Sequence, residues 1–135
     1  MDFDIKVTDN SGKFLSELAR KKILALAQLG QMAEGYAKAD CPVDTGRLRN
    51  SITWAMATQY GTYSYTDDKG NSCTDASRKP DDNGAVYIGS NVVYAARQEY
   101  GDSFSHTVGK AHFLRDAATT HGTEYKKEVE KIMKA

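Results

Sequence analysis

Apolar residues recur every three to four positions between residues 13 and 39, which predicts a long amphipathic helix. Pro42 lacks a backbone N–H and disfavours helical geometry at the residue before it, so this helix should end near Asp40. Gly30 and Gly35 interrupt the run, and they predict either kinks or places where another backbone comes close. The apolar stripe consists of Leu15, Leu18, Leu26, Leu29, Met32, Ala33 and Tyr36.

Three stretches have the alternation or the β-branched and aromatic content of strands: residues 2–7, 51–65 and 85–88. The first reads as a short edge strand, and the second should turn or bulge at Gly61. Residues 66–83 are almost all polar and carry several turn signals, so we expect a hairpin tip and a mobile loop there. Alternation within the second stretch places three side chains on one face, namely Ile52, Trp54 and Met56.

Helical patterns return near the C-terminus. Residues 92–100 predict a short helix that ends at Gly101, and residues 112–134 predict a last helix interrupted at 119–122. The order of elements predicts an α+β fold: a long N-terminal helix and a C-terminal helix packed on a small, mainly antiparallel sheet with a protruding hairpin loop. A chain of 135 residues suits a single domain, residues 1–135.

Charge, cysteine content and hydropathy limit what kinds of partner and compartment the protein could have. Lysine plus arginine and aspartate plus glutamate both number 18, so the net charge is zero, which argues against nonspecific binding to nucleic acid or an anionic membrane. The two cysteines, Cys41 and Cys73, form no CxxC pair and are expected to be free thiols in a reducing compartment. Neither a basic leader with an apolar core nor a run of about 20 apolar residues occurs, so we expect a soluble protein without a signal peptide.

Signatures of catalysis are absent from the sequence. His106, His112 and His121 are isolated, and GxSxG, GxxxxGK[ST] and GxGxxG motifs do not occur. We therefore expect no catalytic residue, no cofactor and no metal site. Cys41 with a distant histidine remains a weak alternative as a catalytic dyad.

Charged and aromatic side chains leave alternatives open. Glu99, which stands near tyrosines, is conceivable as a general base, although an ion pair with one of the arginines is the favoured interpretation. Four basic residues could line a DNA passage, but solvated or interface positions are favoured for them: Arg47, Arg49, Arg97 and Lys110. The eight tyrosines fit equally well a protein interface and the rim of a core.

Three motifs in a fixed order carry a family resemblance. Residues 41–52 read CPVDTGRLRNSI, residues 94–101 read YAARQEYG after VYIGS at 86–90, and residues 112–117 read HFLRDA. Their order and spacing resemble the tail-component, or neck, protein family of long-tailed bacteriophages and prophages. The chain departs from the family pattern where His112 and Asp116 replace prolines, and where the 66–83 loop is longer than usual.

The resemblance implies a non-enzymatic virion protein that forms a ring at the head-tail junction, as a neck or tail-completion protein. Its partners would be further copies of itself and other head-tail connector and tail proteins, with no cofactor and no membrane. The protein would reside in the virion, and in the host bacterial cytoplasm during assembly. We expect the strand at 2–7 and the loop at 66–83 to make the contacts, and a module that contacts DNA remains the alternative.

The motif residues are expected to set shape and not to perform chemistry. Asp44 and Thr45 would cap a short helix, and Arg47 would pair with Glu99 to lock the first two motifs together. The two tyrosines of the second motif would pack its helix against the sheet. The full set is Pro42, Asp44, Thr45, Gly46, Arg47, Leu48, Tyr94, Glu99, Tyr100, Gly101 and Phe113.

Overall fold

The computed structural model describes residues 11–42, 46–76, 78–92, 95–100 and 111–135. The strand expected at 2–7, the capping residues Asp44 and Thr45, Tyr94 and Gly101 lie outside this part. The helices are α1 (Ser11–Asp40), α2 (Arg47–Ser51), α3 (Ala95–Tyr100), α4 (Phe113–Thr119) and α5 (Gly122–Lys134). The strands are β1 (Thr53–Ala55), β2 (Tyr63–Thr66), β3 (Ser72–Asp75) and β4 (Tyr87–Gly89).

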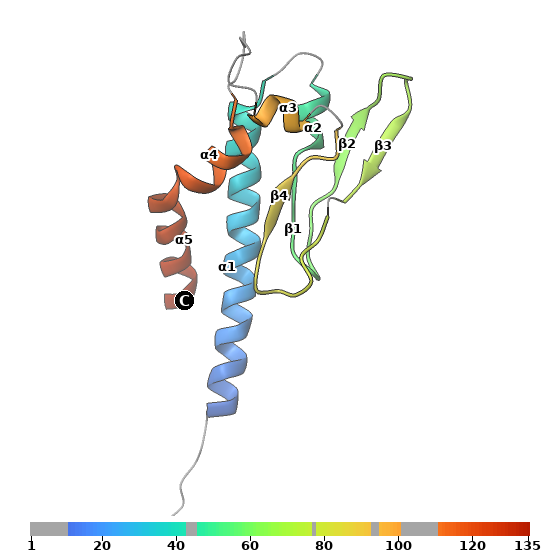
Figure 1. Ribbon diagram of the computed structural model, residues 1–135. Helices are drawn as coiled ribbons and strands as arrows, with labels where there is room; N and C mark the ends of the chain where they lie inside the picture. Colours follow the sequence, from blue (N-terminus) through green and yellow to red (C-terminus); the bar gives the residue numbers. More distant parts are fainter. Residues whose placement is uncertain (1–10, 43–45, 77, 93–94, 101–110) are drawn as a thin grey trace, which may run out of the picture.

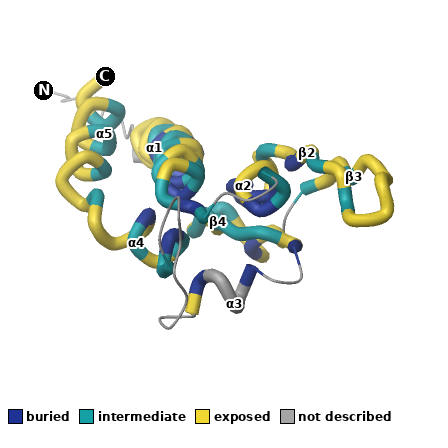
Figure 2. The backbone as a smooth tube through the Cα atoms, turned by 90° about the horizontal axis from the view of Figure 1, so that it is seen from above, coloured by how far each residue is buried: buried dark blue, intermediate teal, exposed yellow. Residues whose placement is uncertain are grey.

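Helix α1 forms the axis of the molecule. Figure 1 shows it as one unbroken helix, with the strands on one side and α4 and α5 on the other. The view along α1 in Figure 2 gives the same order, from α5 through α1 to α2 and the β2–β3 pair. The predicted α+β arrangement, with small antiparallel sheets beside long helices, is confirmed.

Gly30 and Gly35, in the middle of α1, have different surroundings. A Cβ atom added to Gly30 would lie 2.6 Å from Cγ2 of Val86 and 3.0 Å from Cε3 of Trp54, so a side chain here would clash with the strands. A Cβ atom at Gly35 would meet nothing within 4 Å. The glycines predicted a close backbone, whereas the atoms that come close belong to side chains, and they do so at Gly30 and not at Gly35.

The strand predicted over residues 51–65, with a turn or bulge at Gly61, is two separate strands, because the chain reverses within that stretch. The amide of Met56 donates to the carbonyl of Gln59 at 2.7 Å, and the amide of Gly61 donates to that of Trp54 at 3.0 Å. β1 therefore pairs antiparallel with β4, while β2 belongs to a second sheet with β3. Residues 51–56 are all buried, so both faces of β1 are covered and alternation carries little information there.

β2 and β3 form a separate antiparallel pair, which we call the β2–β3 arm (residues 63–75). Figure 1 shows the arm extending to the side away from α1, and its far end is exposed in Figure 2. The turn is held by Asp67, whose carboxylate accepts hydrogen bonds from the amides of Asn71 at 2.8 Å and Lys69 at 2.9 Å. These bonds lower the pKa of Asp67, with the Asn71 amide as the largest cause. Since β3 lies within the stretch expected to be a tip and loop, strand pairing extends further than predicted.

The C-terminal helix is interrupted where the sequence predicted, between α4 and α5. α5 runs back along α1: the imidazole of His121 stacks on the ring of Tyr36 with centroids 3.6 Å apart. At the other end of α5, Nζ of Lys21 donates to the carbonyl oxygen of Ala135 at 2.6 Å. α5 therefore covers α1 only as far as Lys21.

Candidate assembly surfaces

The first motif forms a small hydrogen-bonded corner around α2. Gly46 precedes the helix with φ of 82°, a conformation that glycine adopts without strain. Nε of Arg47 donates to the carbonyl oxygen of Thr66 at 3.0 Å, which ties α2 to β2. The hydroxyl of Ser51 donates to the carbonyl of Leu48 at 2.6 Å and forms a further hydrogen bond with the hydroxyl of Ser90. The corner thus connects α2 to β2 and to the segment after β4.

The second motif is joined to the third through Glu99. Its carboxylate accepts hydrogen bonds from the amides of Leu114 at 2.8 Å and Arg115 at 2.9 Å, and its carbonyl oxygen accepts one from the amide of His112 at 2.8 Å. Glu99 is 4% exposed, so its negative charge is buried at the N-terminus of α4, where unsatisfied amides favour it. Glu99 therefore acts as a cap for α4, supplied from α3.

This arrangement corrects two of the roles expected for the motif residues. The ion pair between Arg47 and Glu99 does not occur among the described side chains, because Glu99 is occupied by backbone amides and Arg47 contacts β2. Tyr100 is 74% exposed, so it does not pack α3 against the sheet. α2 carries no side-chain cap hydrogen bond in the described part of the chain.

His112 explains why proline is absent from the start of the third motif. Its φ is 59°, in the left-handed region, and its amide donates to Glu99. Proline fixes φ near −65° and has no N–H, so it could satisfy neither requirement. Proline therefore could not replace His112 in this chain without a change of the local backbone.

All three motifs contribute to one hydrophobic cluster. Leu48 and Ile52 from the first motif share it with Ala95 from the second and with Phe113 and Ala117 from the third. Ile52, Phe113 and Ala117 are fully buried. Leu48 and Ile52, which are four residues apart, therefore face the same core.

Cys41 belongs to the same cluster and is fully buried. Burial raises the pKa of its thiol from 9.0 to about 12, so the thiol stays protonated at neutral pH. A protonated thiol is a poor nucleophile. This removes the support for a dyad that uses Cys41.

The N-terminal end of α1 carries a group of exposed apolar side chains. Residues 12–20 are all exposed, and Phe14, Leu15 and Leu18 keep 65%, 60% and 38% of their surface accessible. These three side chains share one face, because residues three and four apart are neighbours on a helix. We call this segment the α1 tip (residues 12–20). Figure 1 shows it extending past α5 and the strands.

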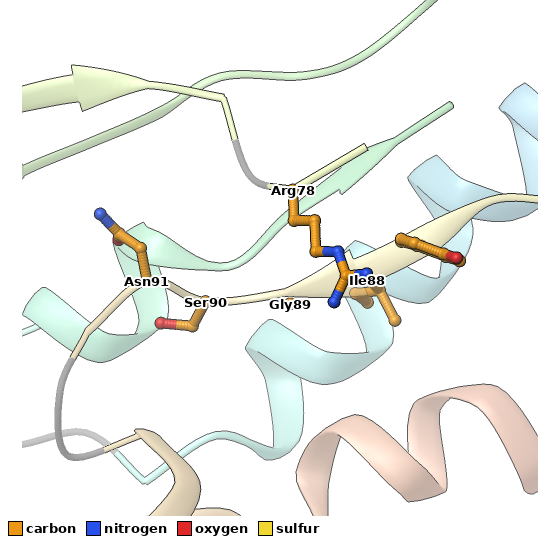
Figure 3. Close-up of a pocket in the computed structure, with 6 residues that line it drawn as sticks. Arg78, Ile88, Gly89, Ser90 and Asn91 are labelled. Atoms are coloured by element: carbon orange, nitrogen blue, oxygen red, sulfur yellow. The ribbon is translucent and has the colours of Figure 1, made fainter. Parts of the chain in front are cut away.

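A second open surface follows β4, which has a strand neighbour on one side only in the described part of the chain. On one side of β4 a groove of about 430 Å³ is lined by Arg78, Tyr87, Ile88, Gly89, Ser90 and Asn91. Figure 3 shows the side chain of Arg78 reaching across toward β4. On the side facing α1 a smaller groove of about 200 Å³ is lined mainly by apolar side chains from α1, β4, α4 and α5.

The described residues contain no group of three or more His, Cys, Asp or Glu side chains that could hold a metal ion. Within the same residues, no helix is long and apolar enough to cross a bilayer.

A compact motif core with open surfaces around it is typical of a protein that acts through its contacts. Comparison with family models gives the class: residues 5–101 match the HK97-gp10-like family, described as "Bacteriophage HK97-gp10, putative tail-component". The chain belongs to this family of phage tail components, which are structural proteins of the virion. Neither curated proteins nor solved structures gave a match.

Sequence reasoning missed the α1 tip, because the apolar periodicity continues into it through Leu15 and Leu18. The available signal was the distribution of small residues. The buried alanines of α1 are Ala25, Ala27, Ala33 and Ala37, all after the tip. Alanine on a helix face permits close packing of a neighbour, so its concentration there marks the covered part of α1. Arg78 was also missed, since it lies in the polar stretch interpreted as a loop.

Proposed function

We propose that the protein acts at the head-tail junction of a long-tailed phage or prophage, as a neck or tail-completion protein. In this proposal the whole chain works as a single domain and assembles into a ring, which docks on neighbouring connector and tail proteins. Family membership supports the class of tail component. The position at the junction and the ring are our inference.

The observation that carries the proposal is the exposed apolar face of the α1 tip. Phe14 and Leu15 lie beyond the end of α5, where no described segment covers them. An apolar stripe on a projecting helix is a common feature of helices that dock into a groove of another protein. The tip therefore supplies a contact directed away from the body of the subunit.

Within this proposal the motif residues fix the subunit's shape. Leu48 and Phe113 share the core, and Glu99 holds α3 against α4. Replacing these residues would alter assembly by changing the angles between helices and strands, and it would not remove any catalytic activity. The alternative of a module that contacts DNA has less support, because the net charge is zero and Arg47 is held against β2.

The test is deletion of the gene from its phage or prophage, with electron microscopy of the resulting particles. We expect DNA-filled heads and complete tails that remain unjoined, and restoration of whole virions by the gene in trans. The purified protein, alone and mixed with separated heads or tails, should form rings or collars visible by negative stain and by mass measurement. Normal virions in the deletion strain would overturn the proposal, as would heads that fail to fill.

A further inference from the structure

Among the described residues β4 has no strand neighbour on one edge, which we call its free edge, and the register shows which backbone groups point there. The carbonyl oxygen of Trp54 accepts a hydrogen bond from the amide of Gly61, so it points to the side of β1 away from β4. Because N–H and C=O of one residue point to the same side of a strand, and neighbouring residues alternate, Thr53 and Ala55 bond to β4. Their register partners are Gly89 and Tyr87. Ile88, which pairs with Trp54, therefore directs its N–H and C=O to the free edge.

The grooves on either side of this edge differ in character. The groove facing α1 is bordered by apolar side chains, among them Leu29 and Val86. The groove on the opposite face contains a single charged residue among its described lining residues, Arg78. The segment around Arg78 is anchored: Nζ of Lys79 lies 3.6 Å above the ring centroid of Tyr60, and Pro80 is buried. A strand added to β4 would thus have the apolar groove against one of its faces and Arg78 against the other.

Residues 2–7 of this chain have the matching pattern. Phe3, Ile5 and Val7 alternate with Asp2, Asp4 and Lys6. As a strand, the segment would present one apolar face and one polar face that carries two carboxylates, because side chains alternate along a strand. The apolar face suits the groove beside α1, and the aspartates suit Arg78.

Chain length excludes pairing of this whole segment within the same subunit. Val86, at the start of the β4 region, lies against Gly30, and Ile88 packs against a cluster that contains Ala37. The helix axis from Ser11 to Gly30 is about 28 Å long at roughly 1.5 Å per residue. Residues 7–11 span at most about 14 Å when fully extended. Residue 7 of the same chain therefore falls about 14 Å short of Val86.

We propose that the free edge of β4 accepts residues 2–7 of a second copy of the chain as an added strand. Main-chain hydrogen bonds to Ile88 would supply affinity, while the two grooves would set which face of the strand points inward. Each subunit then donates one strand and accepts one. A head-to-tail contact of this kind closes into a ring when the rotation between subunits permits. The inference rests on the proposed self-assembly and names the contact that would produce it.

Disulfide trapping between two variants that each carry one engineered cysteine tests the contact, with Cys73→Ser as background and the buried Cys41 retained. One chain carries Tyr87→Cys in the groove of Arg78, and the other carries Asp2→Cys, Asp4→Cys or Lys6→Cys. Because the two engineered thiols are on different chains, a disulfide between them can form only where two subunits are in contact. We expect a covalent dimer for at least one donor position, both in the purified protein and on assembled particles.

Two controls sharpen the trapping. Leu24→Cys replaces Tyr87→Cys at a matched exposure of 44% against 43%, but on α1, and should give no dimer. Ile5→Cys places the thiol on the opposite face of the donated strand and should not link to Tyr87→Cys. Trapping through Ile5→Cys alone would overturn the proposed orientation, and equal trapping at Leu24→Cys would overturn the contact.

Charge exchange gives an independent measurement. Arg78→Glu should weaken self-association about tenfold, and the double change Asp2→Lys with Asp4→Lys should do the same. Combining all three should restore most of the lost association. Rings that form unchanged without residues 2–7 would overturn the strand contact and leave the proposed function standing. A chain that forms no ring or collar, alone or on particles, would instead contradict the proposed function.

Discussion

The carboxylate of Glu99 accepts a hydrogen bond from the backbone amide of Leu114 at 2.8 Å, across fifteen positions of sequence. The same carboxylate also binds the next amide of α4, so one buried side chain satisfies two of the free N–H groups at the start of that helix. Through this contact the second and third motifs of the family behave as a single unit.

Loss of the cap should therefore destabilise the fold. Glu99→Gln keeps the size of the side chain but removes its charge and one acceptor, and we expect a loss of about 1–2 kcal/mol in the free energy of unfolding. Glu99→Ala should cost more, because it removes both acceptors. Urea unfolding followed by circular dichroism measures the loss. Glu130→Gln, an exposed change on α5, is the control and should leave stability within about 0.5 kcal/mol.

Opposite results are expected for the same substitution at Gly30 and at Gly35, both in the middle of α1. Gly30→Ala gains helix propensity, but its Cβ would lie 2.6 Å from Cγ2 of Val86, and overpacking of this kind costs about 1–3 kcal/mol. Gly35→Ala meets nothing within 4 Å and should stabilise by about 0.5–1 kcal/mol. Thermal and urea unfolding of the two variants give the comparison. Stabilisation by Gly30→Ala would contradict the close packing of α1 on the strands.

The helical part of the fold could be predicted because it depends on local pattern. α1 runs from Ser11 to Asp40 where periodicity and Pro42 predicted it, and the break before α5 follows from the polar run at 119–122. The strands were harder, since β1 is buried on both faces and a turn after it decides which sheet each strand joins.

The partner of Glu99 could not be predicted from the sequence. Its acceptors are filled by backbone amides, which every residue possesses, so no residue type identifies them. Arginine side chains were the visible candidates, and Arg47, the one expected to pair with Glu99, donates to β2 instead. The family motifs indicated that Glu99 mattered, but its role depended on the fold.

The two thiols should react at very different rates. Burial holds the pKa of Cys41 at about 12, whereas Cys73 is half-exposed on the β2–β3 arm. Iodoacetamide at pH 8 should label Cys73 in the native protein and Cys41 only after unfolding, as read by mass spectrometry of peptides. Because the folded thiol resists ionisation, the folded state should also lose stability as pH rises from 9.0 toward 12. Equal labelling of both thiols in the native state would contradict the buried position of Cys41.

Substitutions at the α1 tip should separate assembly from stability. Phe14 and Leu15 are 65% and 60% exposed, so Phe14→Ser combined with Leu15→Ser removes little buried area and should change the unfolding free energy by no more than about 0.5 kcal/mol. The same variant loses the apolar face proposed for docking, so it should fail to restore virions in a strain that lacks the gene. Lys13→Ser, an exposed change beside it, is the control and should restore virions.

A double variant that is stable and restores virions normally would show that the tip makes no essential contact. One that unfolds readily would show that these two side chains are buried within the subunit. Only retained stability together with lost assembly fits a tip that acts by contacting another subunit or a neighbouring tail protein.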